Sequence, residues 1–356
     1  MLDFLIIGGG IAGLSAGARL AELGRVLVVE AEDSLGYHAS GRSAALYASD
    51  YGAPATVAVT HASEAGLRAM NALSPRGYLM VAKPDERALF DRECADLAMR
   101  EIPREKALEM VPILNPETLG FAAYTETAQD IDTDLVMQAY AKAIRAAGGE
   151  IRTRAPVTAI TRTDDGWRVM AGGVEVFARR LVNAAGAWAD QIAVMAGVAP
   201  VGLTPLRRSI AQIPAPAGVD SSHWPMLLSA GETWYAKPQA GKLLVSPADE
   251  DPAEPHDAWA DDMVLAEGLA RYEEMVTEPV TRLETSWAGL RTFAPDRTLV
   301  LGPDPDEPAF LWCAGQGGQG FQSAPGVAAV LLETAGGPPS GQPEAILRAL
   351  SPARFR

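Results

Sequence analysis

The first thirty residues place the strongest constraint on what this chain can fold into. Leu2–Ile7 is a continuous apolar run, typical of a strand buried on both faces of a parallel sheet. A G-x-G-x-x-G turn over Gly8–Gly13 leads into an apolar helix, which we expect over Ile11–Leu23. Arg25–Glu30 then has the pattern of a second strand. The sequence therefore predicts a β-α-β unit at its very start.

The spacing of the glycines in this unit predicts a dinucleotide-binding site. Gly8 permits the tight turn, Gly10 lets the backbone approach a pyrophosphate, and Gly13 allows close packing of helix on strand. The helix N-terminus then offers free N–H groups and the positive end of its dipole to the phosphates. Glu30 ends the second strand, where a carboxylate accepts hydrogen bonds from ribose hydroxyls.

The rest of the chain alternates between helical and strand patterns. We expect helices over 54–73, 84–100, 132–147 and 322–334, a hairpin turn at 163–166, a buried strand over 180–185, and a strand-rich stretch over 203–246. The alternation indicates an α/β fold in which a Rossmann-like domain carries an inserted antiparallel-sheet domain. The expected division is 1–78, 132–200 and 295–356 for the nucleotide domain, and 79–131 and 201–294 for the substrate domain.

Charge and composition limit the classes of molecule that the chain can bind. Its 356 residues carry a net charge of −15, which argues against nucleic acid or an anionic membrane as a partner. The acidic run between Asp249 and Asp262 is interpreted as a solvated loop. Two distant cysteines and four scattered histidines predict neither a disulfide framework nor a metal site. We expect neither a signal peptide nor a transmembrane segment, and hence a cytoplasmic location.

Three downstream segments favour FAD over NAD. The first is a loop after the second strand, the second is a strand that runs into small residues, and the third is a glycine cluster before an apolar helix. The N-terminus of that last helix is suited to stabilising negative charge on a flavin. The expected FAD contacts in these segments are Gly41, Arg42, Ser43 and Ala44, then Ala185, Gly186 and Trp188, then Gly317, Gly318, Gly320 and Phe321.

These segments, with others, resemble the D-amino-acid oxidase and glycine oxidase superfamily of FAD-dependent enzymes. Within it, the chain is most similar to the bacterial D-arginine dehydrogenases, and the resemblance covers nearly the whole chain. The residues that carry it are 36–45, 130–134, 182–188, 207–209, 224–227, 287–291 and 316–318.

The resemblance implies a non-covalent FAD and the oxidation of a D-amino acid to an imino acid, which hydrolyses to a 2-oxo acid and ammonia. It also implies that Arg208, Tyr235 and Arg291 hold the substrate carboxylate, with Gly318 and Gln322 nearby and Tyr51 on a lid. Arginine suits this role because its planar guanidinium binds a carboxylate through two parallel hydrogen bonds.

Two positions depart from the D-arginine enzymes. Tyr78 stands where they carry a carboxylate that faces the substrate guanidinium, and Leu46 stands where they carry a histidine. Both changes remove charge or polarity from the side-chain pocket, and a buried guanidinium without a partner is costly. We therefore expect neutral or apolar D-amino acids as substrates and D-Arg as a poor one. Asp50 is the residue that could replace the missing carboxylate.

Three further expectations concern electron transfer and alternatives. Lys242 is one residue out of register for an oxygen-activating lysine, which favours a dehydrogenase with an acceptor such as a quinone over an oxidase. His38 and Cys313 are not expected to attach the flavin. The alternatives are a glycine- or sarcosine-type amine oxidase, a 2-hydroxy acid dehydrogenase on the same fold, and a flavin-binding subunit that needs partner proteins.

Overall fold

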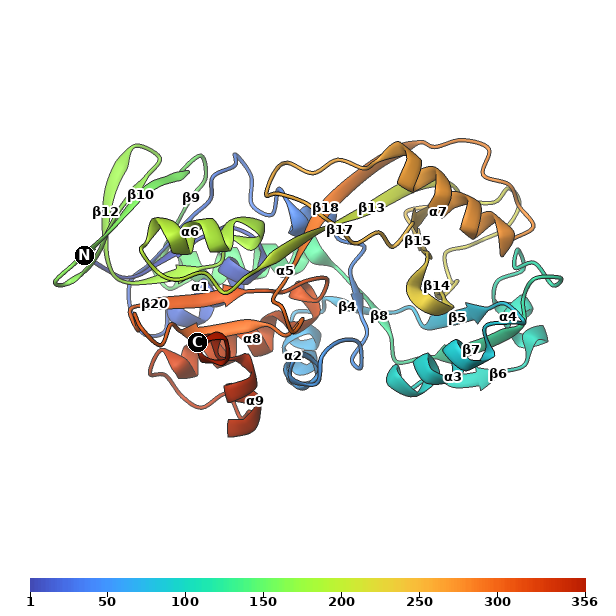
Figure 1. Ribbon diagram of the computed structural model, residues 1–356, viewed down its shortest axis with the longest axis horizontal. Helices are drawn as coiled ribbons and strands as arrows, with labels where there is room; N and C mark the ends of the chain where they lie inside the picture. Colours follow the sequence, from blue (N-terminus) through green and yellow to red (C-terminus); the bar gives the residue numbers. More distant parts are fainter.

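The computed structural model describes residues 1–356 and contains two large sheets that occupy the two ends of an elongated molecule (Figure 1). Both chain termini lie at the end formed by the first sheet (Figure 1). The long strands β13 (Thr204–Pro214) and β18 (Thr285–Phe293) run through the middle of the molecule and belong to the second sheet. None of the helices is long and apolar enough to cross a membrane.

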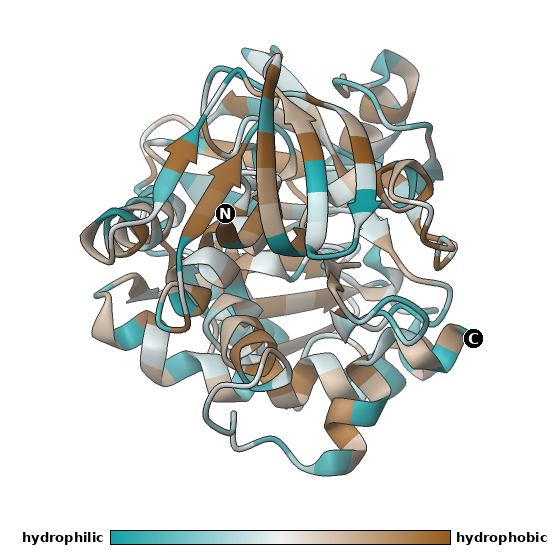
Figure 2. Cartoon of the chain, turned by 90° about the vertical axis from the view of Figure 1, so that its left-hand side faces the viewer, coloured by the Kyte–Doolittle hydropathy of each residue, from teal (hydrophilic) through white to brown (hydrophobic).

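The first sheet is built on parallel strands, as the N-terminal β-α-β unit predicted. β1 (Leu2–Ile7) pairs in parallel with β2 (Val26–Val29) and with β12 (Val174–Asn183). The remaining strands of this sheet are β9 (Glu150–Arg152), β10 (Val157–Thr163), β11 (Gly166–Ala171), β19 (Val300–Pro303) and β20 (Phe310–Ala314). Figure 2 shows apolar residues along the strands at this end of the molecule.

Helices cover one face of this sheet. The other face packs against a short helix and the β10–β11 hairpin, which is itself the edge of the sheet. Phe4 and Ile6 of β1 pack in one apolar cluster, whereas Leu5 and Ile7 pack in a second cluster on the opposite face. The first face is covered by α1 (Ile11–Leu20), α2 (Pro54–Ala69), α5 (Thr133–Ala146) and α8 (Gly320–Thr334), and the second by β10, β11 and α6 (Ala189–Met195). The short helix α9 (Glu344–Leu350) lies near the C-terminus. Burial of both faces confirms the expectation from the apolar run 2–7.

The second sheet is antiparallel except where β5 (Tyr78–Ala82) runs parallel to β14 (Met226–Ser229). Its other strands are β6 (Arg100–Ile102), β7 (Phe121–Thr125), β15 (Tyr235–Gln239), β16 (Lys242–Ser246) and β17 (Asp251–Pro252), with β13 and β18. The helices α3 (Arg87–Asp96), α4 (Arg104–Met110) and α7 (Asp262–Glu274) belong to this end of the molecule. The fold class is therefore confirmed. The domain division remains our proposal, with Tyr78 moved to the second domain because it begins β5.

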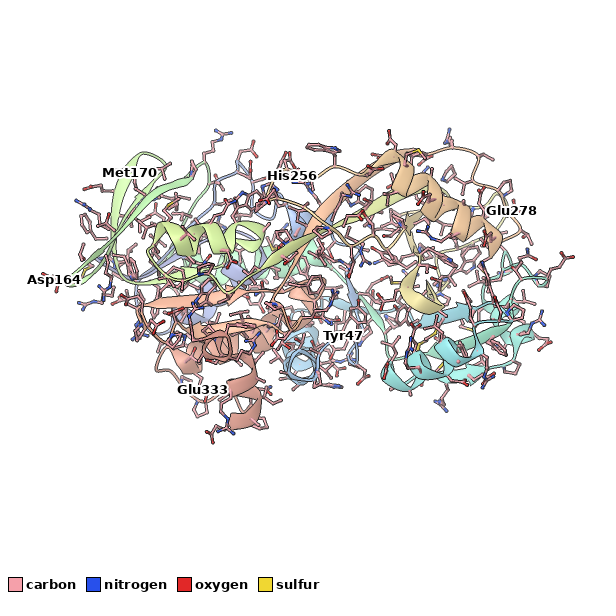
Figure 3. The ribbon with its side chains drawn as sticks, viewed as in Figure 1. Tyr47, Asp164, Met170, His256, Glu278 and Glu333 are labelled. Carbon is pink, nitrogen blue, oxygen red and sulfur yellow. The ribbon has the colours of Figure 1, made fainter.

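A small three-stranded sheet lies between the two ends and connects them. It is formed by β3 (Leu46–Tyr47), β4 (Leu73–Pro75) and β8 (Gln129–Ile131). Figure 3 places Tyr47 near the middle of the molecule and Asp164 at the far tip of the β10–β11 hairpin, which confirms the expected turn at 163–166.

Several element boundaries differ from the sequence expectation. The helix expected over 54–73 ends at Ala69, because Asn71 adopts a left-handed conformation with φ 56° and Leu73 starts β4. The helix expected over 84–100 ends at Asp96, since Ala98 has φ 50°. The strand expected over 180–185 is the second half of β12, because no turn residue interrupts the chain between Val174 and Asn183.

Candidate active site

The glycine turn after β1 adopts the geometry that its spacing predicted. Gly8 has φ 113°, and a Cβ placed on it would lie 2.3 Å from the carbonyl oxygen of Ala184. A Cβ on Gly13 would lie 1.9 Å from the carbonyl oxygen of Gly8, so only glycine lets α1 sit this close to the turn. The N-terminus of α1 has no side-chain cap at Gly10, which leaves donors toward an anion.

Glu30 lies beside this turn, at the end of β2. Its carboxylate accepts hydrogen bonds from the backbone N–H of Gly9 at 2.6 Å and from that of Glu32 at 3.0 Å. The side chain also lines the cavity described next, where a ribose hydroxyl would find an acceptor.

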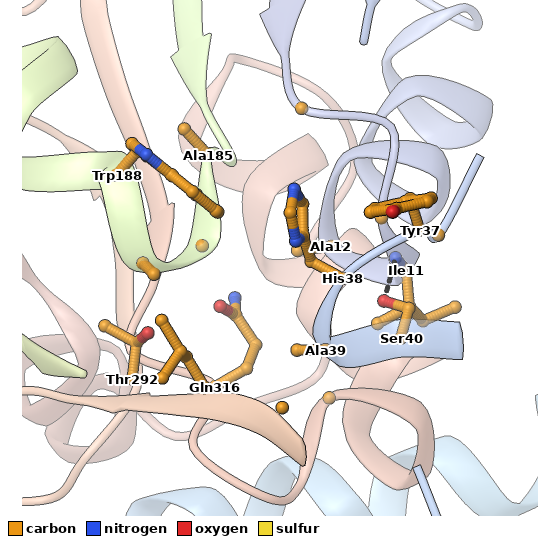
Figure 4. Close-up of a pocket in the computed structure, with 18 of the residues that line it drawn as sticks. Ile11, Ala12, Tyr37, His38, Ala39, Ser40, Ala185, Trp188, Thr292 and Gln316 are labelled. Carbon is orange, nitrogen blue, oxygen red and sulfur yellow. Dashed lines mark hydrogen bonds between the residues drawn. The ribbon is translucent and has the colours of Figure 1, made fainter. Parts of the chain in front are cut away.

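One large cavity runs along the C-terminal edge of the first sheet and reaches the second sheet. Its volume is about 420 Å³, within the range of small-molecule and cofactor sites. Figure 4 shows part of its wall, with Ser40 accepting a hydrogen bond from the N–H of Ile11 at 3.0 Å. Most of the expected cofactor residues line it, namely Gly8, Gly10, Glu30, Arg42, Ser43, Ala44, Ala185, Gly186, Trp188, Gly317, Gly318, Gly320 and Phe321.

Two expected cofactor residues do not line the cavity. Gly13 acts through packing, as described above. Gly41 is needed for a tight turn, because its N–H donates to the carbonyl of Gly36 at 2.6 Å and a Cβ would lie 2.5 Å from that oxygen. Both glycines therefore shape the site without lining it.

Arg42 closes the cavity from the side. Its guanidinium donates to the carbonyls of Ala258 at 2.7 Å and Ala288 at 2.9 Å, and it is ion-paired with Asp257. His256 and Ala258 also line the cavity, so this ion pair fixes a strap across it. We refer to residues 253–260 as the strap.

His38 and Trp188 face each other inside the cavity (Figure 4). Their ring centroids are 4.6 Å apart, and the His38 Nε2 lies 2.9 Å from a carboxylate oxygen of Glu32. Cys313 is a buried residue of β20 and packs in the apolar core, and neither it nor Cys94 lines the cavity.

A second helix N-terminus, that of α8, meets the cavity beside the N-terminus of α1. α8 begins at Gly320 after Gln319, which provides no side-chain cap. The positive end of the helix dipole and its free N–H groups point toward a cavity lined by Gly317 and Gly318. The two helix N-termini lie close together, because a Cβ on Gly320 would lie 3.1 Å from Cγ2 of Ile11. Both open onto one cavity, and they fit the pyrophosphate and the electron-rich ring of a flavin dinucleotide.

Arg291 lies where this cavity reaches the second sheet. It projects from β18, lines the cavity, and makes no hydrogen bond or ion pair with any residue of the chain. A guanidinium enclosed by protein normally has an anionic partner. Arg291 is therefore a ready binding group for a carboxylate.

Arg208 lies beside it on β13, but its guanidinium is already engaged. Nε donates to the carbonyl of Asp249 at 2.9 Å, and Nη2 donates to Glu250 at 3.0 Å. Burial and the neighbouring charge of Arg291 lower the pKa of Arg208. The hydroxyl of Tyr235 is buried in the same place and has no hydrogen-bond partner. Arg208, Arg291, Tyr235 and Gly318 are thus brought together, as expected.

Tyr51, the tyrosine expected on a lid, lines an adjoining space, which we name the vestibule. It is lined by Tyr51, Gly52, Ala53, Arg208, Gly231, Glu232, Ala248, Glu250, Phe293, Arg297, Gly318 and Gln319, and it shares Arg208 and Gly318 with the large cavity. The Tyr51 hydroxyl donates to Glu232 at 3.2 Å, and its carbonyl accepts from Gln319 at 2.7 Å. Burial, then the charge of Glu232, raises the pKa of Tyr51, so the phenol stays protonated.

Four other residues expected at the substrate site line neither the cavity nor the vestibule. Tyr78 is buried, and burial, then the charge of Glu232, raises its pKa well above the usual value. Gln322 is buried on α8 and accepts from the N–H of Ala48 at 3.0 Å. Leu46 pairs with Asp130 in the small sheet. Asp50 is bonded to His61 at 3.0 Å and to Ser49 at 2.7 Å, away from the vestibule.

Sequence reasoning missed Glu232, Glu250 and Arg297, and it misjudged the acidic run after residue 248. Asp249 is buried and accepts from Ser209 N at 2.6 Å, and Glu250 binds Arg208, so this part of the run is not a solvated loop. The neighbouring basic residues on β13 were the available signal, because a buried arginine needs an anion.

These features define a class of protein: a Rossmann-type FAD-binding enzyme whose cavity reaches an unpaired arginine on the second sheet. The chain belongs to the FAD dependent oxidoreductase family, whose family model matches residues 3–334. The cofactor is FAD, which would be held by the two helix N-termini and the glycine turns described above.

Named relatives agree with this assignment. FAD-dependent oxidoreductase domain-containing protein 1 of Bos taurus is 25% identical, covering 93% of this chain and 80% of that protein. L-2-hydroxyglutarate dehydrogenase of Escherichia coli is 30% identical over 56% of this chain and 51% of its own length. Among solved structures, L-proline dehydrogenase from P. horikoshii has a TM-score of 0.85 at 22% identity, covering 99% of this chain and 97% of that one, which shows the fold.

Proposed function

We propose that the protein is an FAD-dependent D-amino acid dehydrogenase that acts on neutral or apolar D-amino acids. It oxidises the substrate to an imino acid, which water hydrolyses to a 2-oxo acid and ammonia. Bound FAD supplies the hydride acceptor. The side chains of this protein bind and orient the substrate and exclude water. Preference for the D-enantiomer is supported by the sequence resemblance.

The observation that carries this proposal is the unpaired guanidinium of Arg291. It lines the FAD cavity between Tyr235 and Gly318, and a carboxylate bound there would lie at the flavin end. Two parallel hydrogen bonds to Arg291 would fix the substrate carboxylate, and with it the direction of the Cα–H bond. Arg208 and the Tyr235 hydroxyl would add further donors from the same wall.

Charge balance supports a neutral substrate side chain. The substrate end and the vestibule contain the guanidiniums of Arg208, Arg291 and Arg297 but only the carboxylates of Glu232 and Glu250. One substrate carboxylate would make the numbers of positive and negative charges equal, whereas a cationic substrate side chain would again leave one positive charge in excess. Asp50 is already bonded to His61, which argues against its use as a guanidinium partner.

The surroundings favour an amine over a hydroxyl as the group that is oxidised. An ammonium group loses its proton to water far more readily than an alcohol does, so a hydroxy acid needs a strong general base. No histidine or lysine lines the vestibule, and the pKa values of Tyr51 and Tyr78 are raised. The two histidines that line the FAD cavity are already bonded, His38 to Glu32 and His256 to the carbonyl of Glu254. The 2-hydroxy acid dehydrogenase therefore ranks second, although a relative has that activity in its name.

Two features support a dehydrogenase with non-covalent FAD. The ammonium of Lys242 is bonded to Glu284 at 2.9 Å and does not line the FAD cavity, so it is not placed to activate oxygen. His38 is bonded to Glu32, and no cysteine lines the cavity. An acceptor such as a quinone would then take the electrons.

The proposal is tested by mixing the FAD-loaded protein, without oxygen, with D- and L-amino acids, glycine, sarcosine and 2-hydroxy acids. We expect neutral D-amino acids to bleach the flavin absorbance fastest and D-Arg to do so poorly. Bleaching by sarcosine or glycine alone would favour the amine oxidase, and bleaching by a hydroxy acid alone would favour the second candidate. Activity only after addition of a co-purifying protein would indicate a flavin-binding subunit.

A further inference from the structure

Glu250 lies between two guanidiniums at the vestibule. The same carboxylate oxygen accepts from Arg208 Nη2 at 3.0 Å and from Arg297 Nη2 at 2.9 Å. Burial acts to raise the pKa of Glu250, but the hydrogen bond from Arg297 and the charges of the neighbouring arginines together lower it. Glu250 is therefore an anion held by two cations beside the substrate site.

Both cations are fixed by contacts that do not involve Glu250. Arg208 donates Nε to the carbonyl of Asp249 at 2.9 Å, and its side chain is buried. The guanidinium of Arg297 lies 3.9 Å from the ring centroid of Phe293, a stacking contact that restricts its position. If the charge of Glu250 were removed, the two guanidiniums would remain as a preformed site for another carboxylate.

We propose that Glu250 is a specificity-determining residue that takes the place of a second substrate carboxylate and so excludes amino acids with acidic side chains. The inference rests on the proposed function, in which Arg291 binds the α-carboxylate. It adds that the substrate side chain extends into the vestibule, which adjoins the FAD cavity at Arg208 and Gly318. With Glu250 present, a side-chain carboxylate meets an acid and no free cation. Without its charge, the same carboxylate meets Arg208 and Arg297.

The test compares Glu250→Gln with a control, Glu278→Gln. Glutamine keeps the size and the acceptor oxygen but removes the charge, and Glu278 is an exposed acid that lines neither the vestibule nor the FAD cavity. Binding of glutarate and of butyrate to the oxidised, FAD-loaded protein is followed by the change in flavin absorbance. Neither probe is oxidised, so the measurement does not depend on turnover.

We expect Glu250→Gln to bind glutarate about thirtyfold more tightly than the wild type does, which is the value of roughly one charge-assisted hydrogen bond. Its affinity for butyrate should rise less than about threefold. Glu278→Gln should leave both affinities unchanged, and adding Arg297→Gln to Glu250→Gln should abolish the gain in glutarate affinity. Equal tightening of both acids, or no tightening of glutarate, would overturn the proposal.

Two further variants keep the proposal testable if Glu250→Gln binds no FAD. Glu250→Asp retains the charge and should still prefer butyrate, and Arg297→Gln alone should leave glutarate binding weak. Stronger glutarate binding in either variant would contradict the role of Glu250. The two proposals can fail separately. If Glu250→Gln binds glutarate more tightly as expected but neutral D-amino acids do not bleach the wild-type flavin, then the proposed function is wrong and the anion site formed by Arg208 and Arg297 is supported.

Discussion

Arg208 and Arg291 project from the same face of the second sheet, diagonally across two neighbouring strands. In the pairing of β13 with β18, Arg208 lies opposite Gly289 and Arg291 lies opposite Leu206. The guanidinium of Arg208 donates hydrogen bonds to Glu250 and to the carbonyl of Asp249, whereas that of Arg291 has no hydrogen-bond partner. Two neighbouring positive charges favour an anion between them, and in the proposed function Arg291 is therefore the main substrate anchor and Arg208 an additional contact.

The glycine turn gives a prediction about FAD retention and stability. Gly8→Ala places a Cβ against the Ala184 carbonyl in a left-handed conformation, and we expect more than about 2 kcal/mol of destabilisation and loss of bound FAD. Gly173→Ala is the matched control, because Gly173 also has a positive φ, 77°, but nothing lies within 4 Å of its added Cβ. Urea unfolding and the flavin-to-protein ratio measure both effects. Equal losses in the two variants would contradict the steric argument.

The strap gives a prediction about the rate of FAD release. Arg42→Gln removes the ion pair with Asp257 and the bonds to Ala258 and Ala288, so we expect FAD to dissociate at least about tenfold faster. The rise in flavin fluorescence after dilution measures this rate. The exposed Arg179 serves as the control, because its only ion pair is with Asp3, outside the cavity. An unchanged rate in Arg42→Gln would show that the strap does not retain the cofactor.

The lid gives a prediction about substrate capture. Tyr51→Phe removes the hydrogen bond to Glu232 but leaves the ring in place, so we expect KM for a neutral D-amino acid to rise about three- to tenfold. Tyr124→Phe, remote from the vestibule, should leave KM unchanged. Steady-state kinetics with an artificial acceptor makes the comparison. A Tyr51→Phe enzyme with unchanged KM and kcat would mean that this bond does not hold the lid.

The core gives a prediction about alkaline stability. Burial, then the charges of Glu64 and Asp50, raises the pKa of Tyr47 to about 12. The folded state then holds this proton more tightly than the unfolded state, whose pKa is about 10. The resulting stability, about 2 to 3 kcal/mol, is present below pH 10 and is lost as the pH rises toward 12.

Tyr47→Phe removes this titration. Between pH 9 and pH 12 the unfolding free energy of the wild type should therefore fall by about 2 to 3 kcal/mol more than that of the variant. Tyr140 and Tyr272, also buried, are present in both proteins and cancel in the difference. Urea unfolding at the two pH values measures it. Parallel pH profiles would contradict a titrating Tyr47.

Local patterns allowed the sequence to predict the nucleotide half of the site. The turn at Gly8 and Gly10, the acid at Glu30 and the helix at Ile11 all lie within one β-α-β unit, where glycine spacing and apolar runs determine the geometry. These residues line one cavity or pack beneath it in the structure. Arg208, Tyr235 and Arg291 came from the family resemblance and also lie together.

The charged part of the vestibule could not be predicted in the same way. Glu250 binds Arg208 across 42 positions of the chain and Arg297 across 47. An acidic run looks the same in sequence whether it faces water or a buried guanidinium, and only strand pairing decides between the two. For the same reason, the sequence suggested Asp50 as a pocket acid, whereas Asp50 is bonded to His61 and Glu232 meets the lid.

The role of Arg291 as the carboxylate anchor is tested most directly by comparing D-alanine with its methyl ester. The rate of anaerobic flavin reduction is measured at low substrate concentration for the wild type and for Arg291→Gln. We expect the wild type to favour D-alanine over the ester by about a hundredfold or more, the value of a bidentate charge-assisted contact, and the variant to lose most of this preference. A variant that kept the full preference would show that the substrate carboxylate binds elsewhere.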